Sequence, residues 1–105
     1  MNFKPIDSPY DDLVDVSQLA RDVGYSMDVY LTKNAYNSWI KNGFDKIDNL
    51  MQVLFLAGQA INRNIGNNFT TFDAEINNCT IEFWVKIAGE CEYQKIIIML
   101  PEDYQ

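Results

Sequence analysis

Three carboxylates near the start of the chain, Asp11, Asp12 and Asp15, come nearest to a spacing that could do chemistry. Hard divalent cations take oxygen ligands, so such a group could in principle hold one. However, the run lacks the alternating D-x-D-x-D-G pattern of a calcium loop, and one of its acids is needed to cap a following helix. We therefore predict no metal site.

Most catalytic arrangements are excluded by residue types that the chain lacks. Without histidine there is no Ser–His or Cys–His pair, no histidine general base and no histidine metal ligand. The five glycines are scattered singly, so there is no glycine-rich phosphate loop. Cys79 and Cys91 have no CxxC spacing, and we interpret them as packing residues. We expect no catalytic residue, no cofactor and no enzymatic activity.

The chain is strongly acidic, with a formal net charge of −7 and a pI near 4.3. This charge argues against nucleic acid or an anionic membrane as partner, because neutralising phosphate requires clustered Lys and Arg. A basic host protein matches the charge better. Most of the acids lie in 1–31 and 69–105, and they form one acidic face if the two ends meet. The alternative is that these acids only keep a small protein soluble.

The middle segment, 32–68, has a positive balance of charge. Its cations would be the partners of an anionic small molecule, such as a nucleotide-like signal, held between the central helix and the sheet or at a subunit interface. The candidate ligand-binding residues are Lys33, Lys41, Lys46 and Arg63.

Trp84 lies on the polar side of its predicted strand, between Glu82 and Lys86, where a large aromatic side chain needs an explanation. Either a helix covers that side of the sheet, or Trp84 with Tyr30 and Tyr93 forms a surface of the kind enriched at protein interfaces. With the acids, the candidate protein-binding residues are Asp11, Asp12, Asp15, Tyr30, Glu82, Trp84 and Tyr93.

The elements that must position these residues are organised around a helix over 47–65. Apolar residues recur there at the i, i+3, i+4, i+7 spacing of one helical face. They are Ile47, Leu50, Met51, Leu54, Ala57, Gly58, Ile61 and Ile65. Further apolar residues outside this stripe make the helix hydrophobic nearly all round, so we expect it to be covered on two sides.

The chain before this helix begins with an expected extended lead-in over 1–10 and then a strand or the approach to a helix over 11–16. A two-turn helix follows, capped by Asp15 or Ser17 and closed by Gly24. Alternation over 25–31 predicts a strand, after which Thr32 caps a second short helix.

Period-2 alternation after the central helix predicts strands over 69–76, 79–88 and 93–100, with Asn77 and Asn78 as turn residues. We predict a single α+β domain over 1–105, with a three- to four-stranded antiparallel sheet packed on the long helix plus two shorter helices. The last three strands form a meander, and the strand over 25–31 pairs with the last of them. Since one long helix covers only one face of such a sheet, a homodimer that packs the open faces together is a further hypothesis.

The chain has no apolar run near the roughly 18 to 20 residues that a membrane span needs. The N-terminal run MNFKPIDSPYDD lacks the basic and apolar regions of a signal peptide. We therefore expect a cytoplasmic protein.

Three runs carry a resemblance to a known family: LVDVSQLARDVGYSMDVYLTKNAYNSWI, NLMQVLFLAGQAINRN and the C-terminal IIIMLPED. They resemble a family of small uncharacterised proteins encoded by bacteriophages, plasmids and other mobile elements. Its marks are an LVDVS-type opening, a V-x-LT strand that leads to a helix with tryptophan, and an IMLPED-like last strand. The resemblance implies the accessory gene of a mobile element, and it supplies no functional residues.

Small size, acidity, absent catalytic groups and this resemblance favour a non-enzymatic accessory protein that binds and modulates a host protein. Counter-defence is one such role, in which the acidic face mimics nucleic acid and occupies a basic groove. The alternative hypothesis is a protein that binds or sequesters a nucleotide-like signal.

Overall fold

The computed structural model describes residues 6–7, 12–41, 46–89 and 94–104. The elements before the long helix are β1 (Ile6–Asp7), β2 (Leu13–Asp15), α1 (Ser17–Asp22), β3 (Asp28–Thr32), α2 (Lys33–Ala35) and the π-helical turn η1 (Tyr36–Ile40). The long helix and the elements after it are α3 (Lys46–Arg63), β4 (Phe69–Ile76), β5 (Cys79–Ala88), β6 (Lys95–Met99) and the 3-10 turn η3 (Pro101–Asp103). The predicted lead-in over 1–10 thus contains a short strand, and the rest of it lies outside the described residues.

The described strands form one mixed sheet in the order β1-β2-β3-β6-β5-β4. Five of them have three or more residues, and the two-residue β1 extends the β2 edge. β4, β5 and β6 pair antiparallel, which confirms the predicted meander. β3 lies beside β6 as predicted, but the two run parallel, with Val29 opposite Ile96 and Leu31 opposite Ile98. The α+β class is confirmed, whereas the prediction of three to four strands, all antiparallel, was wrong.

Both errors have a physical reason. Alternation tells which face a side chain occupies but not the direction in which its strand runs, so the β3–β6 pair gave no sign of being parallel. β2 has three residues, too few for a period of two to be recognised, and the open choice between strand and helix approach over 11–16 is resolved as a strand.

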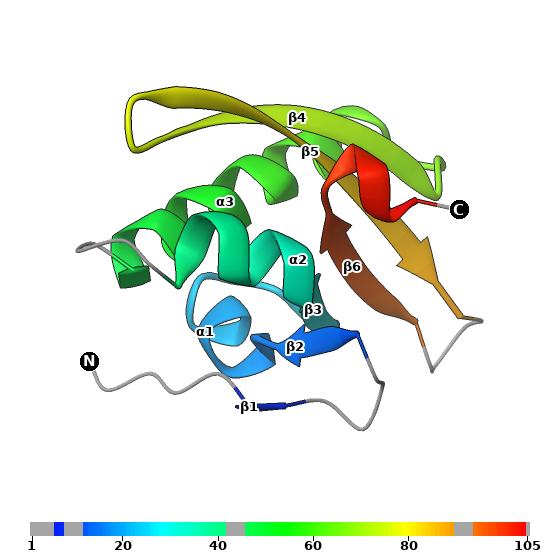
Figure 1. Ribbon diagram of the computed structural model, residues 1–105. Helices are drawn as coiled ribbons and strands as arrows, with labels where there is room; N and C mark the ends of the chain where they lie inside the picture. The colour runs from blue at the N-terminus through cyan, green and yellow to red at the C-terminus, as the bar shows by residue number, and fades with distance from the viewer. Residues whose placement is uncertain (1–5, 8–11, 42–45, 90–93, 105) are drawn as a thin grey trace.

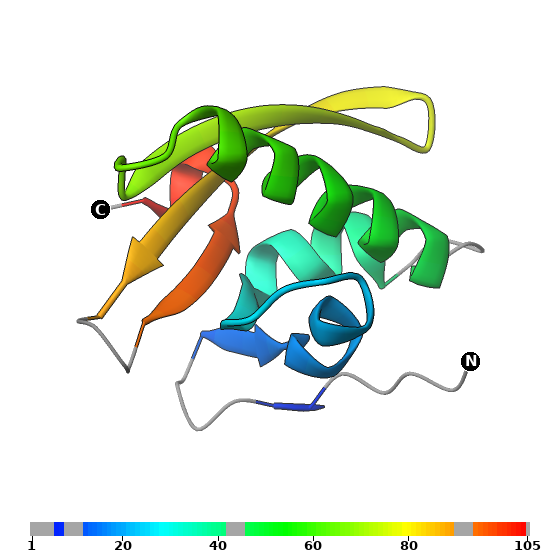
Figure 2. The same ribbon diagram turned by 180° about the vertical axis from the view of Figure 1, so that it is seen from behind.

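The helices α1, α2 and α3 lie on one side of the sheet, as Figures 1 and 2 show from opposite directions. The β4–β5 hairpin extends along α3 in both views. Alternate strand residues face the helices and are buried, because apolar area removed from water stabilises the fold. These core residues of the sheet are Val14, Val29, Leu31, Phe72, Ala74, Ile76, Phe83, Val85, Ile96 and Ile98.

The central helix α3 is buried along one side only. Its buried residues are Leu50, Val53, Leu54, Ala57 and Ala60. By contrast, Phe55 is 63% exposed and Ile65 is 84% exposed. The expected cover on two sides was therefore wrong, because no described element packs against the side of α3 that bears Phe55.

The turns follow the predicted chemistry. Gly24 and Gly66 both have positive φ, 106° and 95°, at the ends of α1 and α3. Asn77 and Asn78 have φ of 53° and 65°, the left-handed pair that a two-residue hairpin turn requires. Cys79, which follows this turn, is exposed, so its interpretation as a packing residue was wrong. Cys91 lies outside the described residues.

Candidate protein-binding surface

The side of the sheet turned away from the helices, which we call the outer face, carries most of the candidate residues. Paired residues on neighbouring strands share a face, so the register sets its rows. One row consists of Asp15, Tyr30, Ile97, Lys86 and Phe69. The next contains Met99, Trp84 and Thr71, and a third contains Glu82 and Asp73. Trp84 and Glu82 are therefore on this face, as the alternation predicted.

Trp84 is half-buried in an aromatic cluster with Phe69 and Tyr104. The ring centroids of Phe69 and Trp84 lie 5.1 Å apart at 88°, and those of Trp84 and Tyr104 lie 5.3 Å apart. Such edge-on arrangements are favourable for aromatic pairs. The side chain is thus partly covered, not by a helix but by the residue that follows η3. Phe69 and Tyr104 remain 38% and 48% exposed, so the cluster presents aromatic area to solvent.

Acidic side chains adjoin this cluster. Asp73 of β4 and Glu82 of β5 are directly opposite each other, and like charges in that position destabilise a sheet. The Trp84 indole N–H donates to Glu82 Oε2 at 2.6 Å, which holds that carboxylate beside the aromatic rings. Glu75 follows Asp73 on the same face and is exposed. Among the described residues no cation forms an ion pair with Asp73, Glu75 or Glu82.

We call the group formed by Phe69, Asp73, Glu75, Glu82, Trp84 and Tyr104 the β4–β5 surface. Of its members, sequence reasoning singled out Glu82 and Trp84 and missed the other four. Phe69, Asp73 and Glu75 were detectable, since they alternate with the apolar side of the strand over 69–76. Tyr104 was not, because it follows the last strand and its position depends on η3.

Tyr30 does not belong to this surface. It lies on the outer face but is only 8% exposed, and its row is not that of Trp84. The expected surface of Trp84, Tyr30 and Tyr93 therefore does not form through Tyr30. Tyr93 and Asp11 lie outside the described residues.

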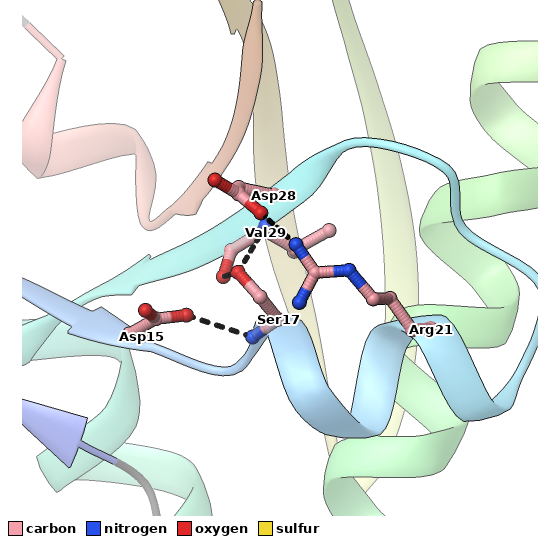
Figure 3. A network of polar contacts seen from close by, with 5 residues as sticks. All are labelled: Asp15, Ser17, Arg21, Asp28 and Val29. Atoms are coloured by element: carbon pink, nitrogen blue, oxygen red, sulfur yellow. Dashed lines mark hydrogen bonds and ion pairs between the residues drawn. The ribbon is translucent and has the colours of Figure 1, made fainter.

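Asp15 bonds to its own chain. Its Oδ1 accepts from the Ser17 backbone N–H at 2.9 Å (Figure 3). The N-cap of α1 is nevertheless Val16, without a side-chain cap, so the prediction of Asp15 or Ser17 as the cap was wrong. The buried Ser17 hydroxyl donates to the Val29 carbonyl oxygen at 3.3 Å and accepts from the Val29 N–H at 2.9 Å. An ion pair between Arg21 and Asp28 closes the same network. The predicted meeting of N- and C-terminal acids fails for Asp15, since three strand spacings, about 14 Å, separate β2 from β5.

Asp12 is exposed and precedes β2, and its carbonyl oxygen accepts from the Lys33 N–H at 2.8 Å. This contact ties the start of β2 to the first residue of α2.

Asp103 is a structural residue that sequence reasoning missed. Its Oδ2 accepts from the Thr32 hydroxyl at 2.7 Å and from the Leu100 N–H at 3.1 Å, and its Oδ1 accepts from the Asn34 side-chain amide at 3.1 Å. Thr32 Oγ1 in turn accepts from the Ala35 N–H at 3.1 Å, which confirms Thr32 as the cap of α2. The V-x-LT and IMLPED-like runs, 71 residues apart at Thr32 and Asp103, thus meet and hold the C-terminal segment in place.

The four candidate cations do not converge. Lys33, Lys41 and Arg63 are exposed, on α2, after η1 and at the end of α3 respectively. The Lys46 ammonium lies 5.8 Å from the centroid of the Tyr36 ring, within the range of a cation–π contact. Lys46 therefore lies near η1, whereas Arg63 is at the opposite end of the 18-residue α3, so the four cations do not form a single anion site.

A pocket of about 400 Å³ lies between α3 and the segment that joins α1 to β3. It is lined by Val23, Gly24, Tyr25, Ser26, Met27, Leu54, Phe55, Gly58, Gln59, Ile61, Asn62 and Ile96. Lys33, Lys41, Lys46 and Arg63 are not among these residues, and the lining carries no charged side chain. The predicted ligand pocket was between the central helix and the sheet, whereas Ile96 is the one sheet residue in this lining, and the chemistry of the lining suits an uncharged ligand.

Tyr25 forms one wall of this pocket. Its hydroxyl donates to the Leu54 carbonyl oxygen, and burial raises the pKa of Tyr25 to about 12, with a backbone hydrogen bond at Gly58 acting in the opposite direction. A Cβ added at Gly58 would lie 3.2 Å from the Tyr25 hydroxyl oxygen, so glycine at this point of α3 permits the close approach.

Across the described part of the chain, no group of three or more His, Cys, Asp and Glu side chains is arranged to hold a metal ion. Within the same residues, no helix has the length and apolar content needed to cross a membrane. Comparison of the chain with protein-family models, with curated proteins and with solved structures found no match. Geometry and charge are therefore the basis of the functional argument.

Proposed function

We propose that this chain is a non-enzymatic accessory protein of a mobile element, which acts in the cytoplasm and binds a basic surface of a host protein. The observation that carries the proposal is the β4–β5 surface. It combines partly exposed aromatic rings, which are enriched at interfaces, with carboxylates that have no described cationic partner. Counter-defence, with the acids standing in for nucleic acid phosphates, is the role that fits the resemblance to mobile-element proteins.

The opposed pair Asp73 and Glu82 supports an external partner. A like-charge pair across two strands lowers stability in the free protein, and a cation from a partner between the two carboxylates turns this repulsion into attraction. The aromatic rings beside them supply the apolar area that electrostatic attraction alone lacks. Charge then sets the rate and specificity of binding, and the rings provide much of the affinity.

A pair of charge-matched variants tests the proposal. The surface variant Asp73→Asn, Glu75→Gln, Glu82→Gln and the control variant Asp12→Asn, Asp22→Asn, Asp48→Asn each remove three negative charges, but from different places. Host proteins captured by the wild type and the control variant, and lost by the surface variant, would be identified and purified. Their affinity should fall steeply between about 0.01 M salt, where charges act over roughly 30 Å, and about 1 M, where they act over roughly 3 Å. Affinity that is equal for both variants, or that salt does not change, contradicts the proposal.

The second candidate function, binding of a small molecule, is favoured by the pocket beside Tyr25. Its volume falls within the range of about 300 to 1,000 Å³ typical of ligand pockets. The lack of Lys and Arg in its lining favours an uncharged ligand over a nucleotide. A thermal-shift screen with nucleotides, cyclic dinucleotides and uncharged heterocycles should show a rise in melting temperature for a ligand, and Gln59→Trp should abolish it by filling the pocket. A screen without any rise would leave the protein-binding proposal as the sole candidate.

A further inference from the structure

β4 is a long edge strand. It stands at the end of the sheet order, and its eight residues pair with β5 along their whole length without a bulge. In the described part of the chain no strand lies on its other side, and both ribbon views show β4 along the rim of the sheet (Figures 1 and 2). An unpaired edge of this length exposes a row of backbone donors and acceptors that another strand can use.

The register shows which backbone groups are unpaired. The Ile87 N–H donates to the Asn68 carbonyl oxygen at 2.9 Å, so the hydrogen-bonded positions of this antiparallel pair are the even-numbered residues from 68 to 76. The two-residue turn after Ile76 agrees, because it is closed by a hydrogen-bonded pair. The N–H and C=O groups that point to the open side therefore belong to Phe69, Thr71, Asp73 and Glu75.

The same four residues place their side chains on the outer face, so the open edge carries two adjacent acids. Edge strands are commonly protected by Lys, Pro or a bulge, and β4 has none of these. Its charges are the acids Asp73 and Glu75. A second copy paired with β4 would bring these acids against their own copies on one face, which like-charge repulsion disfavours. The charge of Asp73 and Glu75 thus disfavours pairing of β4 with a second copy of the chain and favours pairing with a basic strand.

We infer that β4 takes up an extended segment of the partner protein as an added strand, with Lys or Arg at alternate positions. This inference rests on the proposed function and specifies how the partner binds. The basic side chains lie on the outer face, roughly 4.5 to 5.5 Å from Asp73 and Glu75 between Cβ atoms. The residues between them continue the inner face beyond Phe72, Ala74 and Ile76, so they are apolar. Backbone hydrogen bonds give affinity, and the acids select a basic segment.

Synthetic peptides test this mode of binding. The probe is a capped heptapeptide of alternating Val and Lys, with a Val–Glu heptapeptide as control. Two further Val–Lys peptides are methylated on backbone nitrogens. The first carries the methyl group on the backbone nitrogen of every Lys, and the second on the backbone nitrogen of every Val. In an added antiparallel strand the Lys N–H groups face β4, and in a parallel one the Val N–H groups do. Strand addition therefore requires that one methylated peptide bind like the parent and that the other lose about tenfold or more in affinity.

The possible results distinguish backbone pairing at the β4 edge from electrostatic attraction to the acids. The Val–Glu peptide should not bind, and the surface variant should bind the Val–Lys peptide more weakly than the charge-matched control variant does. Equal binding of both methylated peptides would overturn strand addition and leave the acidic surface, and with it the proposed function, standing. No difference between the surface and control variants would count against both. Absence of Val–Lys binding to the wild type would also overturn strand addition.

A variant of the protein tests whether the β4 edge pairs with a second copy of the chain instead. Thr71→Pro removes an N–H that points to the open side and leaves the β4–β5 bonds intact, a position at which edge strands tolerate proline. The variant should lose affinity for the Val–Lys peptide, while its melting temperature and its sedimentation should differ little from those of the wild type. A wild-type dimer that Thr71→Pro dissociates would show that the edge pairs with itself, which overturns the inference.

Discussion

Two groups of acidic residues in this protein behave in opposite ways. Asp15, Asp28 and Asp103 bond to their own chain: Asp15 accepts from the Ser17 N–H, Asp28 pairs with Arg21, and Asp103 joins η3 to α2. Asp73, Glu75 and Glu82 form no ion pair with a described residue, and Glu82 accepts from the neutral Trp84 indole. Asp73 and Glu82 also oppose each other across β4 and β5. The first group stabilises the fold and the second works against it. Acidity alone therefore says little about function, since what matters is whether the chain itself satisfies the charge.

The strongest test of the first group is Asp103→Ala. It removes three hydrogen bonds to a carboxylate and leaves the part-buried Thr32 hydroxyl and Leu100 N–H without that acceptor. We expect a loss of about 2 to 4 kcal/mol in the free energy of unfolding, measured by urea denaturation. The neighbouring exposed residue supplies the control, and Glu102→Ala should change stability by less than about 0.5 kcal/mol. Equal effects of the two substitutions would show that the hydrogen bonds of Asp103 do not stabilise the fold.

A smaller loss is expected from Ser17→Ala. The buried hydroxyl both donates to and accepts from the Val29 backbone, so its removal leaves the Val29 N–H without that acceptor. The expected cost is about 1 to 3 kcal/mol in urea denaturation. Ser26→Ala, at an exposed serine, is the matched control and should be nearly neutral. A neutral Ser17→Ala would mean that the contact between α1 and β3 does not depend on this side chain.

Tyr25 is an uncharged counterpart of the first group of acids, because its hydroxyl is also bonded to its own chain. The Tyr25→Phe variant should lose about 1 kcal/mol at neutral pH. The pKa of Tyr25 is about 12 in the folded protein against 10.0 ordinarily, so its stabilising effect is fully present below pH 10 and is lost as pH rises toward 12. The difference in unfolding free energy between wild type and variant should therefore shrink over that pH range. A constant difference would contradict the burial of this hydroxyl.

Much of the fold was readable from local patterns. The bounds predicted for the strands over 69–76 and 79–88 agree with β4 and β5, because alternation over eight or more residues is a strong signal. Capping by Thr32 and the left-handed Asn77 and Asn78 follow from local chemistry. The pairing of β3 with β6 was predicted, but its parallel direction was not, since alternation does not show which way a strand runs. The bond between Thr32 and Asp103 could not be predicted, since it joins residues 71 positions apart.

The candidate site was readable only in part, for the same reason. The alternation over 79–88 placed Glu82 and Trp84 on the outer face, but which residues surround them is decided by pairing with β4 and by the path of the chain after β6. Net charge by segment suggested that the two ends of the chain form one acidic face. The structure places the N-terminal Asp15 across the sheet from Glu82, and the acids beside Glu82 come from β4.

The central claim is that the acids of the β4–β5 surface do not stabilise the free protein. A double-mutant cycle with Asp73→Asn, Glu82→Gln and the double variant measures the coupling between them, and glutamine at 82 retains an oxygen that can accept from the Trp84 indole. We expect each single substitution to stabilise the protein by about 0.2 to 1 kcal/mol, and the double variant to gain less than the sum. The gain should shrink at high salt. Single substitutions that destabilise the protein, with a favourable coupling between Asp73 and Glu82, would show that these acids serve the fold and would contradict the account.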